Sequence, residues 1–287
     1  MLIGFIGQGF IGKNYADDFE RRGFSVVRYS LEEPYRQNKD KISSCDFVFI
    51  AVPTPTTLKG HDDSILRAVL PLVGPDKVVV IKSTILPGTT KKFQEEFPDR
   101  IILHSPEFLA EKTAAFDASN PKRNIIGIAK DSPLHHAAAQ DVLSILPQAP
   151  YKAIVDSNAS ELIKYAGNTF LFFRVLYANF FYDLSQKLGV DYEQVKEAIA
   201  ADPRIGPSHL KVIDDSGHPG ARLGRGAGGH CLIKDFAALR EIYEALYPQD
   251  KEGLDLLRAF EAKNAMLLKN SEKDLDLLQE VYGTNQA

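Results

Sequence analysis

The stretch from Gly226 to Asp235 reads Gly-Ala-Gly-Gly-His-Cys-Leu-Ile-Lys-Asp, with three glycines followed shortly by one cysteine. Glycine has no Cβ, so a ligand can approach this backbone closely. The apolar pattern from Ile233 to Leu239 predicts a helix just after Cys231. The positive end of that helix, with Lys234 beside it, favours the nucleophilic thiolate form of the cysteine. The alternative interpretation is a small buried cysteine next to an ordinary turn.

A second set of polar side chains lies in a long apolar segment, Ala159 to Leu188, which is predicted to be a helix. Lys164, Asn168 and Asn179 are separated by four and eleven residues, offsets that place all three on one helical face. A single lysine in such a segment is usually a surface residue whose stem lies along apolar neighbours. One amine and two amides aligned on a buried helix indicate a polar ligand instead.

The start of the chain predicts a nucleotide-binding unit. A short apolar strand, Leu2 to Ile6, is followed by Gly7-Gln8-Gly9-Phe10-Ile11-Gly12, a helical pattern to about Arg22 and a second strand, Ser25 to Tyr29. In this order the glycine motif indicates dinucleotide binding. Gly7 makes the tight turn, Gly9 lets the backbone meet the pyrophosphate, and Gly12 allows close packing of helix on strand. The pyrophosphate is expected at the helix N-terminus.

The end of the second strand does not carry the usual acidic residue for the ribose hydroxyls. Ser30 stands at that place, with Arg28 two residues before it, and this pair suits a 2′-phosphate. Glu32 and Glu33, in the next loop, offer a substitute carboxylate. At this point the residues leave the choice between NAD and NADP open.

Further strands are predicted at 47–51, 78–81, 101–103, 124–128 and 151–155, and helices alone after Ser157. The sequence therefore predicts an α/β fold, with a Rossmann-type parallel sheet over 1–155 and an all-helical substrate or dimerisation domain over 156–287. Polar residues follow the carboxyl ends of three strands, where open sheets bind ligands: Thr54 and Thr56, Lys82 to Thr84, and His104 to Glu111. Taken singly, an ordinary turn explains Thr54 and Thr56 at least as well, and a solvated first helical turn explains Glu107 and Glu111 at least as well.

Composition excludes several classes of protein. A net charge of −4 without a long basic run does not indicate a nucleic-acid or anionic-membrane surface. Cys45 and Cys231 are far apart and in unlike contexts, which favours a reducing compartment, the cytoplasm, over a disulfide framework. The apolar segment Tyr165 to Tyr182 is interrupted by Asn168, Arg174 and Asn179, so a buried or dimer helix is expected rather than a membrane span. No metal site is expected.

Eight ordered motifs resemble the UDP-glucose/GDP-mannose dehydrogenase family. They are GQGFIG, DFVFIAVPTPT, KSTILPGTT, SPEFLAE, PKRNIIG, ELIKYAGN, DPRIG and GAGGHCLIKD, and they extend from Gly4 to about Leu239. The His230-Cys231 pair resembles the N-acetylmannosamine branch, whereas Lys234-Asp235 resembles the UDP-glucose branch. The resemblance implies NAD-dependent oxidation of the C6 alcohol of a nucleotide sugar to a carboxylate, through a thiohemiacetal and thioester on Cys231.

The resemblance also implies roles for individual residues. Its catalytic set is Cys231, Lys164, Asn168, Asp235, Glu107 and Thr84. Its cofactor-binding set is Gly7, Gly9, Phe10, Ile11, Gly12, Ser30, Val52, Pro53, Thr54, Thr84, Glu111 and Lys234. Its substrate-binding set is Glu107, Phe108, Leu109, Lys164, Asn168, Arg204, Gly228 and Gly229. Arg204 matches an arginine that reaches into a neighbouring subunit, which implies a homodimer built on the long apolar helix.

Three features depart from the family pattern. These 287 residues are expected to lack the family's third domain, which binds the nucleotide. The loop from Gly206 to Cys231 is longer than usual, and Phe180 follows Asn179 where an acidic residue is expected. Two other hypotheses therefore stay open. One is a two-electron dehydrogenase of the β-hydroxyacid type, which needs no cysteine, and the other is a non-catalytic protein that binds NAD(H).

Overall fold

The computed structural model describes residues 1–57 and 60–283. Seven strands form one sheet: β1 (Leu2–Ile6), β2 (Ser25–Tyr29), β3 (Phe47–Ile50), β6 (Val78–Ile81), β7 (Ile101–His104), β8 (Arg123–Ile128) and β9 (Tyr151–Asp156). Two very short strands, β4 (Thr56–Thr57) and β5 (Gly60–His61), pair separately. The α/β class and the strands expected from the sequence are thus confirmed.

The strand order in the large sheet is β2-β1-β3-β6-β7-β8-β9. The first five strands pair in parallel, but β8 runs antiparallel to β7, with Leu103 opposite Ile128 and His104 opposite Gly127. β9 then pairs in parallel with β8. The predicted parallel sheet is therefore confirmed for every strand pair except β7 with β8, whose direction was not predicted because apolar runs such as 124–128 contain no information about strand direction.

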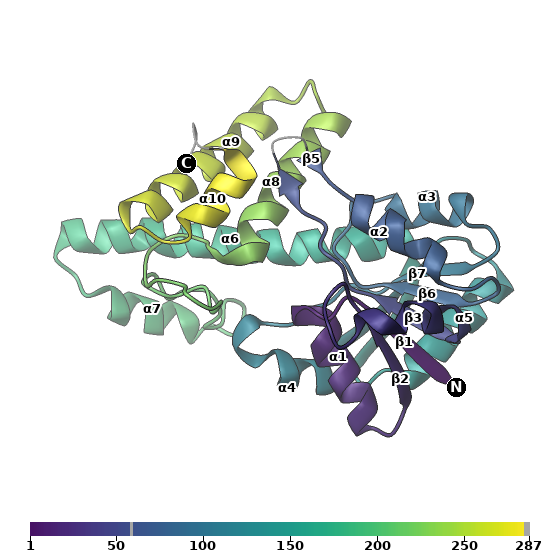
Figure 1. Ribbon diagram of the computed structural model, residues 1–287. Helices are drawn as coiled ribbons and strands as arrows, with labels where there is room; N and C mark the ends of the chain where they lie inside the picture. The colour runs from purple at the N-terminus through teal and green to yellow at the C-terminus, as the bar shows by residue number, and fades with distance from the viewer. Residues whose placement is uncertain (58–59, 284–287) are drawn as a thin grey trace. The chain divides into compact units, whose positions relative to one another are not determined.

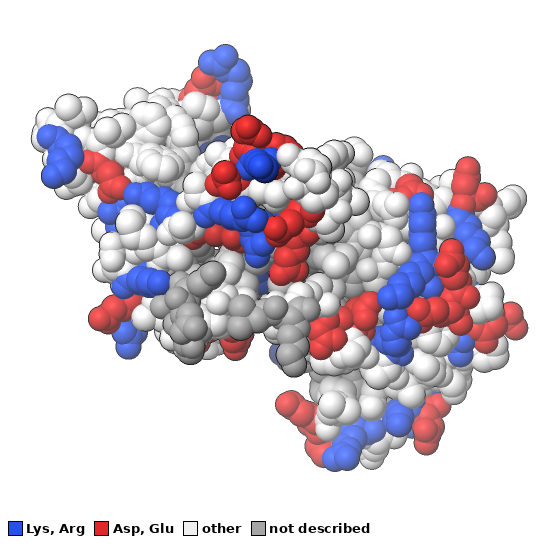
Figure 2. Space-filling view, turned by 90° about the horizontal axis from the view of Figure 1, so that it is seen from above, with Lys and Arg blue, Asp and Glu red and all other residues white. Residues whose placement is uncertain are grey.

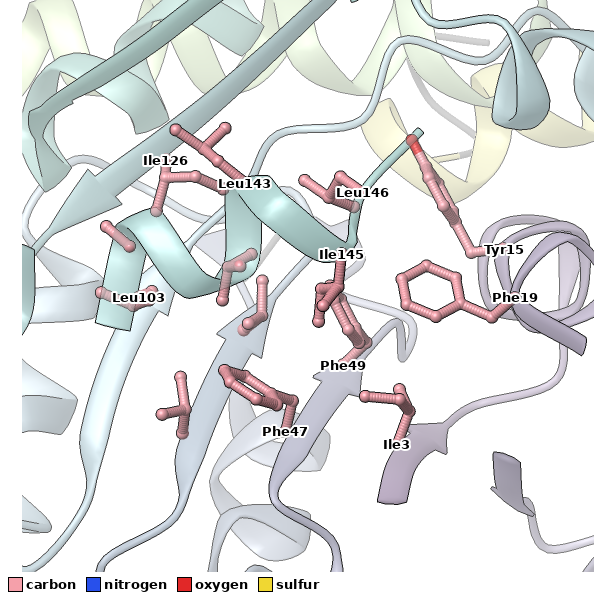
Figure 3. Close-up of a cluster of buried hydrophobic side chains, with 14 of the residues drawn as sticks. Ile3, Tyr15, Phe19, Phe47, Phe49, Leu103, Ile126, Leu143, Ile145 and Leu146 are labelled. Carbon is pink, nitrogen blue, oxygen red and sulfur yellow. The ribbon is translucent and has the colours of Figure 1, made fainter. Parts of the chain in front are cut away.

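Both faces of this sheet are buried, because successive side chains of each strand point to opposite faces and apolar side chains are present on both. Phe47 and Phe49 of β3 point to one face, where α1 (Phe10–Arg21), α4 (Ala114–Ser119) and α5 (Pro133–Ile145) pack. Figure 3 shows Phe19 of α1 and Ile145 of α5 gathered over these strands. Val48 and Ile50 point to the other face, covered by η1 (Arg36–Ser44), α2 (Ser64–Val69), η2 (Leu70–Leu72) and α3 (Thr89–Glu96). A short turn, η3 (Glu111–Thr113), precedes α4.

The contacts divide the chain into two compact units. The first contains Met1–Pro55 and His61–Lys164, and the second begins at Tyr165 and includes Thr56, Thr57 and Gly60. A single long helix, α6 (Ser157–Leu188), runs from the first unit into the second (Figure 1).

The described residues of the second unit form most of α6 and four further helices: α7 (Tyr192–Ala200), α8 (Gly229–Leu246), α9 (Lys251–Asn270) and α10 (Leu275–Tyr282). Phe172 of α6 stacks on Phe236 of α8 with ring centroids 3.9 Å apart. α8 begins at Gly229, four residues before the predicted helix start at Ile233. Glycines weaken the periodic signal there, so Cys231 lies inside the first turn of the helix rather than ahead of it.

The described helices contain no segment that is long and apolar enough to cross a membrane. Figure 2 shows acidic and basic side chains interspersed over the face it draws, as expected for a chain with a net charge of −4.

Candidate active site

The glycine loop after β1 has the geometry that a dinucleotide requires. Gly7 adopts φ +90°, and a Cβ there would clash with the carbonyl oxygen of Ala51. A Cβ on Gly12 would clash with the carbonyl oxygen of Gly7, whereas no atom of a described residue lies within 4 Å of a Cβ built on Gly9. The first turn of α1 contains no acidic residue and no side-chain cap. Its backbone N–H groups therefore suit a pyrophosphate approaching over Gly9.

The loops that follow β3 and β6 are joined to one another. The Thr54 hydroxyl donates to the carbonyl oxygen of Thr84 at 2.6 Å. The Ser83 hydroxyl donates to the Val52 carbonyl at 2.7 Å and accepts from its N–H at 2.9 Å. Pro53 is exposed at the tip of the first loop. These bonds fix the predicted polar residues at the carboxyl edge of the sheet.

Glu107 and Lys164 form a buried ion pair within the first unit. Lys164 Nζ lies 2.7 Å from Glu107 Oε1 and 2.9 Å from the Glu107 carbonyl oxygen. The second carboxylate oxygen accepts from the Leu109 N–H at 2.9 Å. Both side chains are about 5% exposed or less. The loop after β7 and the start of α6 therefore hold one positive and one negative charge together away from water, which gives each a fixed position.

The residues after Glu107 surround this pair. The Arg123 guanidinium lies over the Phe108 ring at 3.6 Å, and Lys164 Nζ lies 5.9 Å from the same ring. Leu109 packs against the core beneath the sheet. Glu111 begins η3 and is half-buried.

In the second unit, Asn168 and Asp235 meet beside the cysteine-bearing turn. Asn168 Nδ2 donates to Asp235 Oδ2 at 2.5 Å, and Lys234 pairs with the other oxygen of the same buried carboxylate. Cys231 is half-buried one helical turn before Asp235. The expected neighbours Gly228 and Gly229 are the N-cap and first residue of α8. A thiol, an amide and a carboxylate are thus presented by two packed helices.

Asn179 does not join this group. It is fully buried, donates to the Val175 carbonyl at 2.9 Å and accepts from Arg225 Nε at 2.8 Å. Arg225 also pairs with Asp183 at 2.6 Å. The third polar residue of the predicted helix face therefore anchors the loop before Gly226 instead of facing a ligand, so that expectation was wrong for Asn179.

Comparison with known proteins identifies the family of the chain. Residues 28–143 match the NAD-binding domain of the UDP-glucose/GDP-mannose dehydrogenase family, and residues 158–266 match its central domain. The chain belongs to this family. It is 32% identical to the UDP-glucose 6-dehydrogenase TuaD of Bacillus subtilis, an alignment that covers 72% of this chain and 44% of TuaD.

Two further relatives share more of their length with the chain. The UDP-glucose 6-dehydrogenase AglM of Haloferax volcanii is 29% identical, over 98% of this chain and 73% of AglM. A UDP-glucose dehydrogenase structure from Pyrobaculum islandicum superposes with a TM-score of 0.76 at 25% identity, over 94% of this chain and 71% of that one. A 3-hydroxyisobutyrate dehydrogenase from Mycobacterium tuberculosis, 17% identical, shares the fold with a TM-score of 0.66.

Membership of the family makes the first unit an NAD-binding domain. The contacts of Arg28 and Ser30, at the end of β2, are consistent with NAD as the cofactor. Arg28 does not extend toward a 2′-phosphate. Its Nη2 lies 2.7 Å from both Glu20 and Asp17, and its side chain is largely buried. Ser30 forms a local bond with the backbone of Glu32. The NADP alternative that Arg28 and Ser30 suggested therefore lacks an available cation.

We expect NAD⁺ to bind at least about ten-fold more tightly than NADP⁺, because the carboxylates around Arg28 would repel a 2′-phosphate. Calorimetric titration of the two nucleotides into the protein measures this ratio. Replacing Asp17 by Asn and Glu20 by Gln removes the two carboxylates that pair with Arg28. This double substitution should reduce the ratio of NAD⁺ affinity to NADP⁺ affinity. Equal affinities in the unsubstituted protein would contradict the expectation.

The structure places a carboxylate close to one departure from the family pattern. Phe180 occupies the place of the acidic residue expected after Asn179, and Asp183 lies one helical turn further along α6. Asp183 pairs with Arg225 and with Lys263, whose Nζ is 3.2 Å away. A carboxylate is thus present on this part of the helix, displaced by one turn. Arg204, by contrast, is highly exposed and pairs with Asp202.

The sequence analysis named Lys82 and His104 only among the polar residues at strand ends, and their burial at the ends of β6 and β7 was not predicted. Lys82 is 2% exposed, lies 4.2 Å from the Tyr15 ring centroid and donates to Ser105 Oγ at 3.1 Å. Burial lowers the pKa of Lys82 to about 7, against the attraction of Glu107. His104 bonds Ser160 through Nδ1 at 2.8 Å, and burial lowers its pKa to about 3. For Lys82, the available signal was a basic residue directly after an apolar strand and before Ser-Thr.

Lys82 should give the protein a distinctive stability profile. Between pH 7 and the ordinary lysine pKa of 10.5, the unfolded chain binds a proton that folded Lys82 does not. The free energy of unfolding should therefore rise with pH across this window, by roughly 1 kcal/mol per pH unit. Urea unfolding at pH 7.5 and 9.5 should show this rise, and Lys82→Met should lack it. An identical slope in both proteins would refute the assignment.

The described residues include no group of three or more His, Cys, Asp or Glu side chains arranged to hold a metal ion.

Proposed function

We propose that this protein oxidises the C6 alcohol of a nucleotide sugar, similar to UDP-glucose, to the uronic acid with NAD as the acceptor. The observation that carries this proposal is Cys231 in the first turn of α8, one turn before a buried carboxylate that Asn168 holds. The two-electron relatives of this fold need no nucleophile at that place. The names of the relatives, UDP-glucose 6-dehydrogenases at 29–32% identity, point to the same reaction.

The first oxidation removes the hydroxyl proton and a hydride from C6 and leaves an aldehyde. NAD, when bound, supplies the two-electron acceptor. Val52, Pro53, Thr54, Thr84, Glu111 and Lys234 complete the proposed cofactor contacts beyond the glycine loop. Lys164 and Asn168 are proposed to stabilise the negative oxygen that develops at C6, since fixed donors are most effective where charge appears in the transition state. The hydrogen bond from Lys164 to Glu107 fixes the position of the Lys164 side chain.

Cys231 makes the second oxidation possible. Its thiolate adds to the aldehyde carbon and gives a thiohemiacetal, which loses a proton and a second hydride to become a thioester. Water then attacks the thioester, releasing the carboxylate and returning the thiol. Asp235, with Thr84 and Glu107, is proposed to position or deprotonate that water. The second oxidation thus starts from a covalent adduct and not from a hydrated aldehyde.

A turnover screen tests the function. UDP-glucose, UDP-N-acetylmannosamine and GDP-mannose are each incubated with the protein and NAD⁺, and NADH and sugar product are quantified. We expect two NADH for each uronic acid formed. One NADH per substrate would favour the two-electron hydroxyacid reaction. Calorimetric binding of NADH without turnover of any sugar would favour a non-catalytic role.

We also propose that the protein forms a homodimer through α6. Large apolar side chains remain exposed along one stripe of this helix at helical spacing: Phe170, Tyr177, Phe181, Leu184 and Leu188. A second copy of the same helix would cover them, and Arg204, exposed in the monomer, would then be available to a neighbouring subunit. Location in the cytoplasm remains a prediction from cysteine usage.

A further inference from the structure

Side chains of α9 and of the turn that follows α9 form hydrogen bonds to the loop that precedes Cys231. The Asn264 side chain accepts from the Ala227 N–H at 2.7 Å and donates to the Ala227 carbonyl at 2.9 Å. Lys273 Nζ donates to the Gly226 carbonyl at 3.1 Å. Both side chains are buried. A segment more than thirty positions away in sequence thus fixes consecutive peptide groups of the glycine loop.

Asp274 adds a third and charged contact. Its Oδ2 accepts from the Gly229 N–H at 2.8 Å and from the Ser216 hydroxyl, while Oδ1 lies 3.0 Å from His218 Nε2. The Asp274 side chain is 1% exposed, and its backbone adopts the left-handed conformation with φ +51°. A Cβ on Gly228 would clash with this carboxylate, which explains the glycine at that position.

This carboxylate lies at the start of the helix that carries Cys231. Gly228, the N-cap of α8, has no side chain, so Asp274 supplies the acceptor for the first N–H of the helix. Burial opposes its ionisation, but the bonds from Ser216, His218 and Gly229 hold the pKa of Asp274 below its ordinary value. A negative charge at this place acts against the positive helix end that would otherwise favour a thiolate two residues later.

We propose that Asp274 is a positioning residue for Cys231, which fixes the first turn of α8 and sets the pH range in which the thiol ionises. The proposal rests on the proposed function only in giving Cys231 a reaction to perform. Asp274 restrains the nucleophile by its charge, and His218 moderates that charge. The charged and titratable side chains packed around this turn within the second unit include His218, His230, Lys234, Asp235, Lys273 and Asp274. Arg222, Glu272 and Asp276 line the same hollow as His218, His230 and Asp274.

The alkylation rate of Cys231 by iodoacetamide, measured against pH by intact mass, tests the proposal without substrate or NAD. Cys45 is fully buried and burial raises its pKa to about 11, so Cys231 is the thiol that reacts. Asp274→Asn keeps the shape and an acceptor but removes the charge. The alkylation midpoint is the pH at which the alkylation rate reaches half of its maximum. We expect this midpoint to fall by about one pH unit in Asp274→Asn. Asp276→Asn makes the same change at an exposed site two residues away and should leave the midpoint unchanged.

His218→Gln provides the second, opposite test. It removes the imidazole that bonds Asp274 Oδ1, so the negative charge of the carboxylate acts more strongly on the Cys231 thiol. The alkylation midpoint should therefore rise. A merely structural role predicts shifts in one direction for both substitutions. If Asp274→Asn does not fold, His218→Gln alone decides: an upward shift supports the proposal and an unchanged midpoint overturns it. An unchanged midpoint in folded Asp274→Asn, or an equal shift in Asp276→Asn, also overturns it.

The outcomes separate this inference from the proposed function. If no nucleotide sugar is oxidised but the midpoints shift as expected, the proposed reaction fails and the role of Asp274 stands. If two NADH per sugar are formed and the midpoints do not move, only the role of Asp274 fails.

Discussion

Replacing Cys231 by alanine is expected to reduce uronic acid formation by about a thousand-fold or more, because the aldehyde can no longer be captured covalently. The fold should tolerate the change, since the thiol is half-buried and alanine is a strong helix former. Product analysis by mass spectrometry and NADH absorbance together measure acid and reduced cofactor. Binding of NAD⁺, followed by calorimetry, should be unchanged.

Cys45→Ala is the matched control, because it makes the same chemical change in the core of the first unit. It should keep acid formation, with at most a modest loss of stability. Acid formation at the original rate in Cys231→Ala would remove the cysteine from the mechanism. A variant that forms aldehyde at the normal rate but no acid would place the cysteine in the second oxidation.

Lys164→Met should have the second large effect, on both stability and turnover. It leaves the buried Glu107 carboxylate without its partner, which costs about 3–5 kcal/mol in the free energy of unfolding. It also removes a donor to the developing oxyanion, which is worth about 10²–10³-fold in kcat. Urea unfolding and steady-state kinetics measure the two effects separately.

The double variant Lys164→Met with Glu107→Gln distinguishes structure from catalysis. The neutral amide needs no buried cation, so most of the lost stability should return while turnover stays low. Lys187→Met, in the exposed last turn of the same helix, should leave both quantities unchanged. If the double variant recovers turnover together with stability, Lys164 serves the fold and not the chemistry.

Much of the first unit could be predicted from sequence because its signals are local. The glycine loop, the short apolar strands and the polar residues after them each occupy a few consecutive positions. The direction of β8 was missed because pairing partners, and not the residues of a strand, decide whether it runs with or against its neighbour. The engagement of Arg28 by Glu20 was missed for a similar reason: strand and helix must pack before the two meet.

The sequence predicted which residue types form the candidate site, but not which side chains contact one another. Lys164 and Asn168 stood out by helical spacing, yet the same spacing included Asn179, whose neighbour Arg225 comes from a loop without periodicity. Lys82 appears in sequence as one more polar residue after a strand, and only the fold covers it with Tyr15. Asp274 lies in a polar turn that resembles a solvated connection between helices, although it is almost completely buried.

The reversed direction of β8 and β9 determines what would be needed to engineer the Lys164 amine into another dinucleotide-binding fold. β9 ends at Asp156, level with Ile128, which in turn faces Leu103 near the end of β7. α6 therefore passes His104 with Ser160 and reaches the Glu107 loop with Lys164 one turn later. In an ordinary parallel sheet, the helix after a strand runs back along the sheet. Grafting this amine onto another dinucleotide fold would therefore require two inverted edge strands as well as the lysine.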